Sequence, residues 1–294
     1  MENALDAPLV SVLLASYNHA SYVEASVRSV MAQKGVDFEL IVVDDGSTDD
    51  SPKILESLQK ELGFIYVHRP NKGFLPTMNE LLSLAHGKYF CSFASDDIMP
   101  ADRLCKQSAF LAAHPGSVAC FGQVVYLTEN GPEQQMVPLY LKNVPEVKFE
   151  EVFVSDKALH GCSEMLVTEA VRSIGGYDPN YYFEDMPLYF ALLTKFGPQP
   201  VSADILCCEY RIHGSNMHGN YTKMYTEILR LLEQYKSHPL YKYANSRWRA
   251  RWFSTLAYKD KWLAVRMFPR LASFTHAFWF RMPKLFIPRC FLKC

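Results

Sequence analysis

The chain has 294 residues, of which 49% are hydrophobic and 21% charged, and its formal net charge is -1. This composition is typical of a soluble globular protein rather than a low-complexity chain, and the length allows one large α/β domain with an appendage, or two domains. The charge is unevenly distributed. Residues 236–294 contain 13 Lys and Arg but one acidic residue, Asp260, whereas residues 1–235 carry 17 basic and 30 acidic residues. Such asymmetry predicts a C-terminal region that meets an anionic surface.

The sequence predicts neither a secretion signal nor a membrane-spanning helix. The N-terminal residues MENALDAP are acidic and lack an apolar core, and no stretch reaches the roughly 18 apolar residues of a spanning helix. The eight cysteines show no C-x-x-C spacing, and several lie in apolar, strand-like runs. Buried free thiols in a reducing compartment are therefore favoured over disulfides or zinc. We expect the active domain to be cytoplasmic.

The first 100 residues alternate between short apolar runs and amphipathic helices. The predicted strands cover residues 10–15, 38–43, 64–67 and 89–94. The predicted helices cover residues 22–33, about 52–62, and a segment that ends at Leu84. Strands that alternate with helices favour right-handed βαβ units and a parallel sheet. The first half is therefore predicted to be Rossmann-like.

The second half is less regular. Its predicted elements are a helix at 101–113, a strand at 118–127, a hairpin at Asn130-Gly131, a strand at 164–167, a helix from Thr168 to Gly175-Gly176, a helix at 183–196, a strand at 205–212 and a helix at 221–235. Residues 132–158 show no clear period and are predicted to be a loop over the sheet face.

Three of the predicted strands end in polar clusters. These clusters are Ser16-Tyr17-Asn18, Asp44-Asp45-Gly46-Ser47 and Ser95-Asp96-Asp97. Because the carboxyl ends of parallel strands share one edge of a sheet, the clusters should converge there. Each cluster alone is also what turns and helix caps require, but three together favour a ligand site.

The acidic clusters also indicate how a ligand would be held. Adjacent carboxylates without Cys or His beside them suit Mg²⁺ or Mn²⁺ rather than zinc. The glycine-rich fingerprints of dinucleotide-binding and phosphate-binding loops are absent from the sequence. The site is therefore predicted to hold a nucleotide through side chains and metal.

Eight segments in order resemble glycosyltransferase family 2, the inverting nucleotide-sugar transferases of the GT-A fold. They run from about Leu9 to His218, over about 70% of the chain: VSVLLASYNHASYVEASVRSVMAQ, FELIVVDDGSTDDS, NKGF, MNELLSLAHGKY, SFASDD, GGYDP, FEDMPLYFALL and YRIHGSN. The resemblance implies a GT-A domain at 1–235, with a nucleotide-binding half at 1–100 and an acceptor half at 101–235. Residues 236–294 lie beyond it.

The resemblance implies a donor pocket built from several of these side chains. Tyr17 would lie against the nucleobase, and Asp45 would accept a hydrogen bond from it, with Asp44 supporting the same pocket. Asp96 would face the ribose or the sugar. The resemblance implies that Lys72 is a further pocket residue, and the alternative is that it is a solvated lysine on the surface.

The resemblance also implies a metal and a catalytic base. Asp97 would bind Mn²⁺ or Mg²⁺, and His213 would reach the metal or the diphosphate, unless it is a structural histidine at a strand end. Asp185 matches the family's base, with Glu184 as the alternative. A carboxylate at this point can take the proton of an acceptor hydroxyl as it attacks the sugar, an effect worth about 10²–10⁴-fold.

The implied activity is metal-dependent, inverting transfer from a nucleotide-diphosphate sugar, most simply a UDP-sugar, to a glycan or polyprenyl-linked acceptor in surface-polysaccharide synthesis. Pro187 and Ala191 depart from the usual family residues, which leaves the acceptor side open. The alternatives are a nucleotidyltransferase that makes nucleotide-sugars, whose Gly-rich basic loop the first strand lacks, and a non-catalytic nucleotide-sugar-binding module.

The C-terminal region is predicted to be helical, basic and aromatic. Trp248, Trp252 and Leu256 follow helical spacing and are flanked by arginines. Basic helices with aromatic faces lie in the membrane interface, so we expect a peripheral protein on the inner face of the cell membrane. The alternative is that these aromatic residues pack on the catalytic domain. Nucleic acid is not an expected partner, because no binding motif for it is present.

Overall fold

The computed structural model describes residues 9–128, 131–137, 144–155, 159–213, 220–272, 276–282 and 286. The chain forms two compact units. Unit 1 comprises Met1–Phe149 and Ala158–Gly214, and unit 2 comprises Glu150–Lys157 and Ser215–Cys294. The helix that follows residue 220 thus belongs with the C-terminal helices, whereas the sequence-based division placed it before residue 236. How function divides between 1–235 and 236–294 remains a prediction.

Unit 1 is an α/β unit. Its elements are β1 (Val10–Ser16), α1 (Val23–Met31), β2 (Phe38–Asp44), α2 (Ser51–Leu62), β3 (Ile65–His68), α3 (Phe74–Leu84), β4 (Tyr89–Ala94), α4 (Arg103–Ala112), β5 (Ala119–Thr128), β6 (Gly131–Val137), β7 (Glu146–Val147), the short 3-10 helix η2 (Gly161–Ser163), β8 (Glu164–Val167), α6 (Thr168–Arg172), α7 (Asp185–Phe196) and β9 (Gln199–Arg211). The predicted alternation of strands and helices over the first 100 residues is confirmed.

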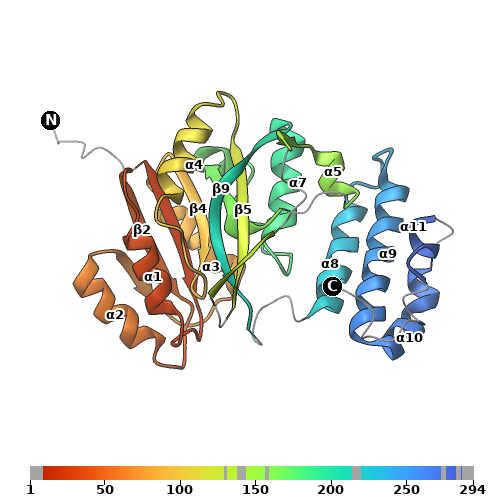
Figure 1. Ribbon diagram of the computed structural model, residues 1–294, viewed down its shortest axis with the longest axis horizontal. Coiled ribbons are helices and arrows are strands. Elements are labelled where there is room, and N and C mark those ends of the chain that lie inside the picture. Colours follow the sequence, from red (N-terminus) through yellow and green to blue (C-terminus); the bar gives the residue numbers. More distant parts are fainter. Residues whose placement is uncertain are drawn as a thin grey trace. The chain divides into compact units, whose positions relative to one another are not determined.

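The strands form a mixed, mostly parallel sheet in the order β3-β2-β1-β4-β8-β5-β9-β7, and β6 pairs with β5 (Figure 1). Strands β3, β2, β1 and β4 are mutually parallel, and β8 is antiparallel to both β4 and β5. The register aligns Ser16 with Asp44 and Ala15 with Ala94. The carboxyl ends of β1, β2 and β4 therefore finish at the same level, as predicted for an α/β fold of this class.

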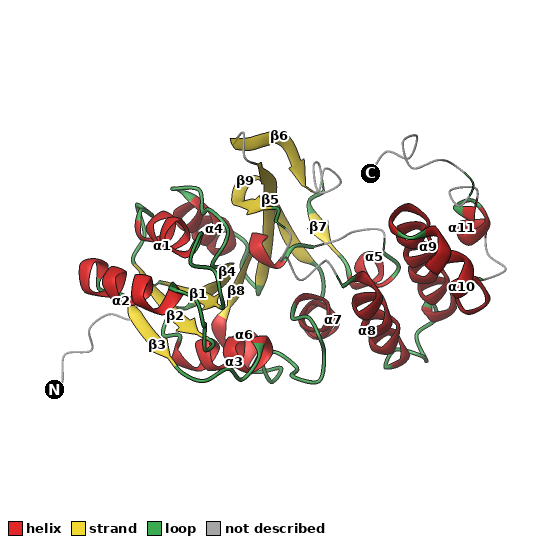
Figure 2. Cartoon of the chain, turned by 90° about the horizontal axis from the view of Figure 1, so that it is seen from below, coloured by secondary structure: helices red, strands yellow, loops and turns green. Residues whose placement is uncertain are grey.

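Helices cover both faces of this sheet, α1 and α4 on one face and α3 and α6 on the other (Figure 2). Alternate residues of β1 point to opposite faces, so Val12 packs with Val27 of α1 in one core cluster, while Leu13 is buried on the other side. Strands buried on both faces need apolar residues at every position, which explains the continuous apolar runs in the sequence.

The prediction of a loop over residues 132–158 was wrong for residues 132–137, 146–147 and 149–153, while residues 138–143 and 156–158 lie outside the described residues. Strand β6 pairs with β5, β7 pairs with β9, and α5 (Phe149–Phe153) follows. Segments this short carry too little periodicity to be recognised, and β6 and β7 form because neighbouring strands offer them hydrogen-bond partners. The predicted hairpin is consistent with the pairing of Thr128 with Gly131, although Asn130 itself lies outside the described residues.

Unit 2 is helical and contains α5 together with α8 (Tyr221–Glu233), α9 (Tyr241–Lys259), α10 (Lys261–Leu271) and α11 (His276–Trp279). The predicted stripe of α9 faces inward, because Trp248, Trp252 and Leu256 are all buried. Trp252 stacks on Tyr225 with the ring centroids 5.8 Å apart. These aromatic residues therefore form the interior of unit 2. Among the described residues, no helix combines the length and apolar character needed to cross a bilayer.

Candidate functional site

The three polar clusters at the strand ends converge, as predicted. The backbone N–H of Asp45 donates to the carbonyl of Ser16 (2.8 Å), and that of Asn18 donates to Ser47 Oγ (2.8 Å). His19 Nδ1 lies 2.7 Å from Ser95 Oγ. Direct hydrogen bonds thus join the end of β1 to the ends of both neighbouring strands, and one polar edge is formed.

The β1–α1 loop presents Tyr17 to solvent. Asn18 has a positive φ of 54°, a left-handed conformation that asparagine tolerates better than most residues. Its side-chain oxygen accepts a hydrogen bond from the N–H of Thr48 at 2.8 Å, which fixes the loop against the end of β2. Tyr17 is 48% exposed at this edge. An exposed ring on a fixed loop is suited to stacking on a nucleobase.

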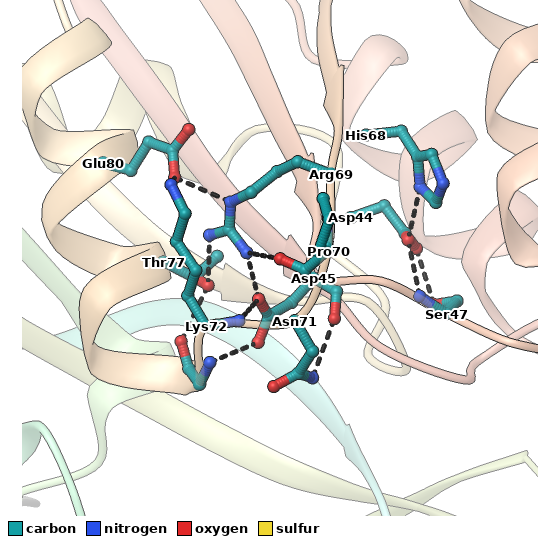
Figure 3. A network of polar contacts seen from close by, with 11 residues as sticks. Asp44, Asp45, Ser47, His68, Arg69, Pro70, Asn71, Lys72, Thr77 and Glu80 are labelled. Atoms are coloured by element: carbon teal, nitrogen blue, oxygen red, sulfur yellow. Dashed lines mark hydrogen bonds and ion pairs between the residues drawn. The ribbon is translucent and has the colours of Figure 1, made fainter.

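Asp44 and Asp45 hold the next loop together (Figure 3). The buried Asp44 carboxylate accepts hydrogen bonds from the N–H and Oγ of Ser47 and lies 3.0 Å from His68 Nδ1. Asp45 forms an ion pair with Arg69 and accepts from the backbone N–H groups of Lys72 (2.8 Å) and Gly73 (3.0 Å). These contacts use three of the roughly four acceptor positions of its carboxylate.

Glycine is required beside these acids. Gly46 has a φ of 75°, and a Cβ added there would lie 2.6 Å from the backbone nitrogen of Asn71. Lys72 extends from the same loop and is largely exposed, with its Nζ 3.7 Å from Glu80 Oε2. The structure therefore keeps Lys72 at the rim of the Asp45 network, held by an acid of α3.

Asp96 meets two imidazoles. Its Oδ2 lies 2.7 Å from His213 Nε2, and both side chains are about nine-tenths buried. His213 stacks on Tyr22 with the ring centroids 4.9 Å apart. Ligand atoms of His19, Asp96 and His213 all lie within 4.8 Å of one another. Two imidazoles and a carboxylate at this separation could hold a divalent metal ion.

Asp97 faces the other way. Its carboxylate accepts hydrogen bonds from the N–H of Arg211 at 2.9 Å and from the Cys208 thiol at 3.3 Å. Burial, together with the charge of Asp96, raises the pKa of Asp97 to about 7. The resemblance implied that Asp97 and His213 would share a metal, whereas the structure brings Asp96 to His213 and places Asp97 beside Cys208 and Cys162. The assignment of metal ligands itself remains a prediction.

Asp185 and Glu184 lie at the start of α7. Burial and the adjacent Asp185 carboxylate raise the pKa of Glu184 well above its ordinary value. An acid with a raised pKa keeps its proton at neutral pH, which makes Glu184 a poor base there. A Cβ added at Gly161 of η2 would lie 3.4 Å from Glu184 Oε1, and the next residue of η2, Cys162, lies beside Asp97. One short helix therefore contacts both the Glu184 side and the Asp97 side of unit 1.

A buried acid and a buried arginine support this region. The Glu164 carboxylate accepts hydrogen bonds from Tyr189 Oη (2.6 Å) and Ser92 Oγ (2.8 Å), and burial raises its pKa to about 7. The fully buried Arg103 donates to the Glu164 carbonyl at 2.8 Å and to the Cys207 carbonyl at 3.0 Å. These bonds join β4, β8, α7 and β9, the elements that carry the candidate base and the acidic loop.

Replacement of Glu164 by Gln should remove a pH dependence of stability. The folded-state pKa of about 7 exceeds the ordinary value of 4.5, so the folded protein binds the proton more tightly. This contribution to stability is complete below pH 4.5 and is lost as the pH rises toward 7. The free energy of unfolding of the wild type relative to Glu164→Gln should fall by about 1–3 kcal/mol across this window. Urea titrations at pH 4.5, 6 and 7.5 measure the free energy of unfolding of the wild type, of Glu164→Gln and of the control Glu56→Gln, whose side chain is exposed. The same pH dependence of this free energy in all three proteins would contradict the prediction.

Four side chains of this region were missed in the sequence: His19, Arg69, Glu164 and Arg211. His19 follows Tyr17-Asn18 in the same loop, and Arg69 follows the end of β3, so both could have been placed at the sheet edge from the strand pattern alone. Arg211 Nε donates to the Asp96 carbonyl at 2.8 Å, and its position beside the acidic loop depends on the pairing of β9 with distant segments. Glu164 gave no signal within its apolar strand.

A mostly parallel α/β sheet with aromatic, acidic and imidazole side chains at its carboxyl edge is the arrangement that the resemblance to the GT-A class of nucleotide-sugar transferases predicted. The profile of glycosyl transferase family 2 matches residues 11–164, more than half of the chain. The protein belongs to this family and is a glycosyltransferase, which sets aside the nucleotidyltransferase and binding-module alternatives.

Individual relatives agree with this membership. The chain is 28% identical over 235 residues to TuaG of Bacillus subtilis (strain 168), a glycosyltransferase ascribed to teichuronic acid biosynthesis, with 76% of this chain and 90% of TuaG covered. It is 32% identical over 127 residues to a PGL/p-HBAD biosynthesis glycosyltransferase of Mycobacterium bovis, covering 42% of this chain and half of that protein.

Two solved structures share the fold. S. aureus TarS 1-349 in complex with UDP-GlcNAc superposes with a TM-score of 0.63 at 17% identity, covering 94% of this chain and 78% of that one. The mannosyltransferase PcManGT from Pyrobaculum calidifontis, in complex with GDP-Man and Mn²⁺, gives a TM-score of 0.60 at 16% identity and covers 91% and 76%. At these identities the likeness establishes the fold of the present chain.

Proposed function

We propose that the protein transfers a sugar, with inversion and with the help of a divalent metal, from a nucleotide-diphosphate donor to a glycan or lipid-linked acceptor in surface-polysaccharide synthesis. A UDP-sugar is the favoured donor, and the enzyme acts at the cytoplasmic face of the cell membrane. The observation that carries the proposal is the convergence of Tyr17, Asp45 and the His19–Asp96–His213 group at one edge of the sheet.

The donor base would be held at the Tyr17 side of this edge. Tyr17 offers an exposed ring, and the remaining acceptor position of Asp45 fits a base that carries an N–H donor, as uracil does. Asp44 shapes the loop without reaching solvent. TarS, which shares the fold, was solved with UDP-GlcNAc, and PcManGT with GDP-Man, so donors of this class support the assignment.

The residues present fit a divalent ion. Asp96 and His213 are in direct contact, and His19 brings a second imidazole within 4.8 Å. Oxygen and imidazole ligands together suit Mn²⁺ better than Mg²⁺, which prefers oxygen alone. When bound, such an ion offsets the negative charge that builds on the departing diphosphate. We assign Asp96 to this role together with His213, and Asp97 to the support of the loop.

Asp185 would act as the base. In an inverting transfer, the acceptor hydroxyl attacks the anomeric carbon in a single displacement, and its proton must leave as the new bond forms. Asp185 is the better candidate because Glu184 has a raised pKa and holds its proton at neutral pH.

A screen of donors tests the proposal. Thermal unfolding of the full chain would be followed with UDP-, GDP- and dTDP-sugars, each with and without Mn²⁺. A ligand present at 100 times its Kd stabilises the folded state by about 2.7 kcal/mol, so one donor with Mn²⁺ should raise the Tm by several degrees. Tyr17→Ala should reduce this shift. A screen in which no nucleotide-sugar shifts the Tm would overturn the proposed donor class.

A further inference from the structure

We propose that one face of α10, centred on Trp262, docks on an anionic lipid surface. This docking rests on the proposed function, which places the enzyme at the cell membrane, and it names the surface that would bind there. Binding to lipid can be measured without donor, acceptor or metal. The α10 face is defined here as Trp262, Val265, Arg266, Pro269 and Arg270, which are all exposed and follow the spacing of one side of a helix.

The opposite side of α10 is already buried within unit 2. Ala264 and Leu271 are buried, and Phe268 packs edge-on against Phe253 of α9 and against Phe278 of α11. Helices α9, α10 and α11 lie side by side around these rings (Figures 1 and 2). The α10 face is therefore not needed for folding of the unit and is held outward by a packed core.

The exposure of Trp262 is unusual for its size. Its side chain is 85% exposed, compared with 8% for Trp248 and 5% for Trp252 in the neighbouring helix. Phe280 and Trp279, which follow α10 in the chain, are also exposed. Tryptophan is favoured at the boundary between lipid and water, where its ring is shielded from water and its N–H still finds a partner. The outward ring of Trp262, together with Trp279 and Phe280, therefore suits such a boundary.

The charge around this face selects the partner. Residues 236–294 carry 13 basic residues against one acid, and Lys261, Arg266 and Arg270 belong to α10 itself. Each basic residue near an anionic membrane strengthens binding roughly several-fold. A second copy would bring two such positive faces together, which the same charges oppose. Apolar rings surrounded by arginines fit a bilayer that contains anionic lipid.

The face also has a hollow. A shallow, open surface depression is lined by Asp260, Trp262, Leu263, Val265 and Arg266. Trp262, Leu263 and Val265 give this depression apolar sides that acyl carbon can contact, and its two charged groups are Arg266 and Asp260, the N-cap residue of α10. The hollow and the exposed stripe share Trp262, Val265 and Arg266, so one substitution tests both.

The experiment is flotation of the full chain with vesicles of phosphatidylcholine alone or with phosphatidylglycerol added. Wild type should float with the anionic vesicles. Trp262→Ser, and separately Arg266→Glu with Arg270→Glu, should each weaken binding by about tenfold or more. Ile65→Ser, which removes an exposed apolar side chain from unit 1, should have no effect. Circular dichroism of each variant confirms folding, which the exposure of all three altered side chains favours.

Brominated phosphatidylglycerol gives a second measurement. The chain has four tryptophans, and bromine quenches those that enter the bilayer. Quenching should be present in the wild type and reduced in Trp262→Ser, because Trp248 and Trp252 are buried and Trp279, at 46%, is less exposed than Trp262 at 85%. Three results would overturn the proposal. The wild type and the α10 variants could float equally, the free protein could self-associate through this face, or the protein could bind nucleic acid in place of vesicles. Donor-induced shifts in Tm would persist in that case, so failure here is separate from failure of the proposed function.

Discussion

Replacement of Asp185 by Asn is expected to lower kcat by about 10²–10⁴-fold while donor binding is preserved. Asparagine keeps the shape of the side chain at the start of α7 but cannot take a proton. The measurement is release of the nucleoside diphosphate from the donor found in the thermal screen, at saturating donor and Mn²⁺. The donor-induced shift in Tm, recorded on the same samples, shows whether the pocket is intact.

The neighbouring acid supplies the matched control. Glu184→Gln should retain most of the activity, because a Glu184 with a raised pKa is already largely protonated at neutral pH. Asp204→Asn, an exposed acid on β9, should be indistinguishable from the wild type. If Glu184→Gln were inactive and Asp185→Asn active, the base would be Glu184. If Asp185→Asn and Glu184→Gln both kept full activity, neither residue would be the general base.

Loss of the Asp96 carboxylate is expected to abolish Mn²⁺ binding. Removal of a side chain that merely supports a ligand costs about 10–100-fold in metal affinity, so removal of a ligand in Asp96→Asn should cost more. His213→Ala should behave similarly, and His19→Ala should lower the affinity and reduce the preference for Mn²⁺ over Mg²⁺. The intensity of the free Mn²⁺ signal in electron paramagnetic resonance, with the nucleoside diphosphate present, reports binding without any turnover.

Two controls make this result specific. His86→Gln removes an exposed histidine that pairs with Glu39, and it should leave Mn²⁺ binding unchanged. Asp97→Asn is the informative comparison, because the sequence analysis assigned the metal to Asp97 while the structure buries that carboxylate against Cys208 and the Arg211 N–H. Loss of Mn²⁺ binding in Asp97→Asn, with full binding in Asp96→Asn, would refute the assignment made from the structure.

Much of unit 1 could be predicted because its signals are local. The apolar runs that became β1, β2 and β4 are continuous, and the helices between them show a clear period. Parallel strands joined by helices leave their carboxyl ends at one edge, so the meeting of Ser16, Asp44 and Ser95 follows from chain order alone. Family 2 membership follows from motifs in that same part of the chain.

Other features depend on partners that are distant in sequence. Segments β6, β7 and α5 are too short to show a period, and they exist because β5, β9 and the helices of unit 2 offer partners. Arg103 is the first residue of α4, a position at which the sequence alone suggests an exposed side chain. Its guanidinium is nevertheless fully buried against carbonyls of β8 and β9. A single sequence gives no sign of such long-range hydrogen bonds.

By itself, the sequence determined that acidic, aromatic and polar side chains would gather at one end of a mostly parallel sheet, because strand polarity leaves them no other place. The tertiary structure alone decided which of two adjacent acids faces the site. Asp96 and Asp97 leave the end of β4 in different directions, and the pairing of β9 draws Asp97 inward while His213 meets Asp96. Packing likewise decided that Trp248 and Trp252 lie inside unit 2 and Trp262 outside, since helical spacing marks a face but not what covers it.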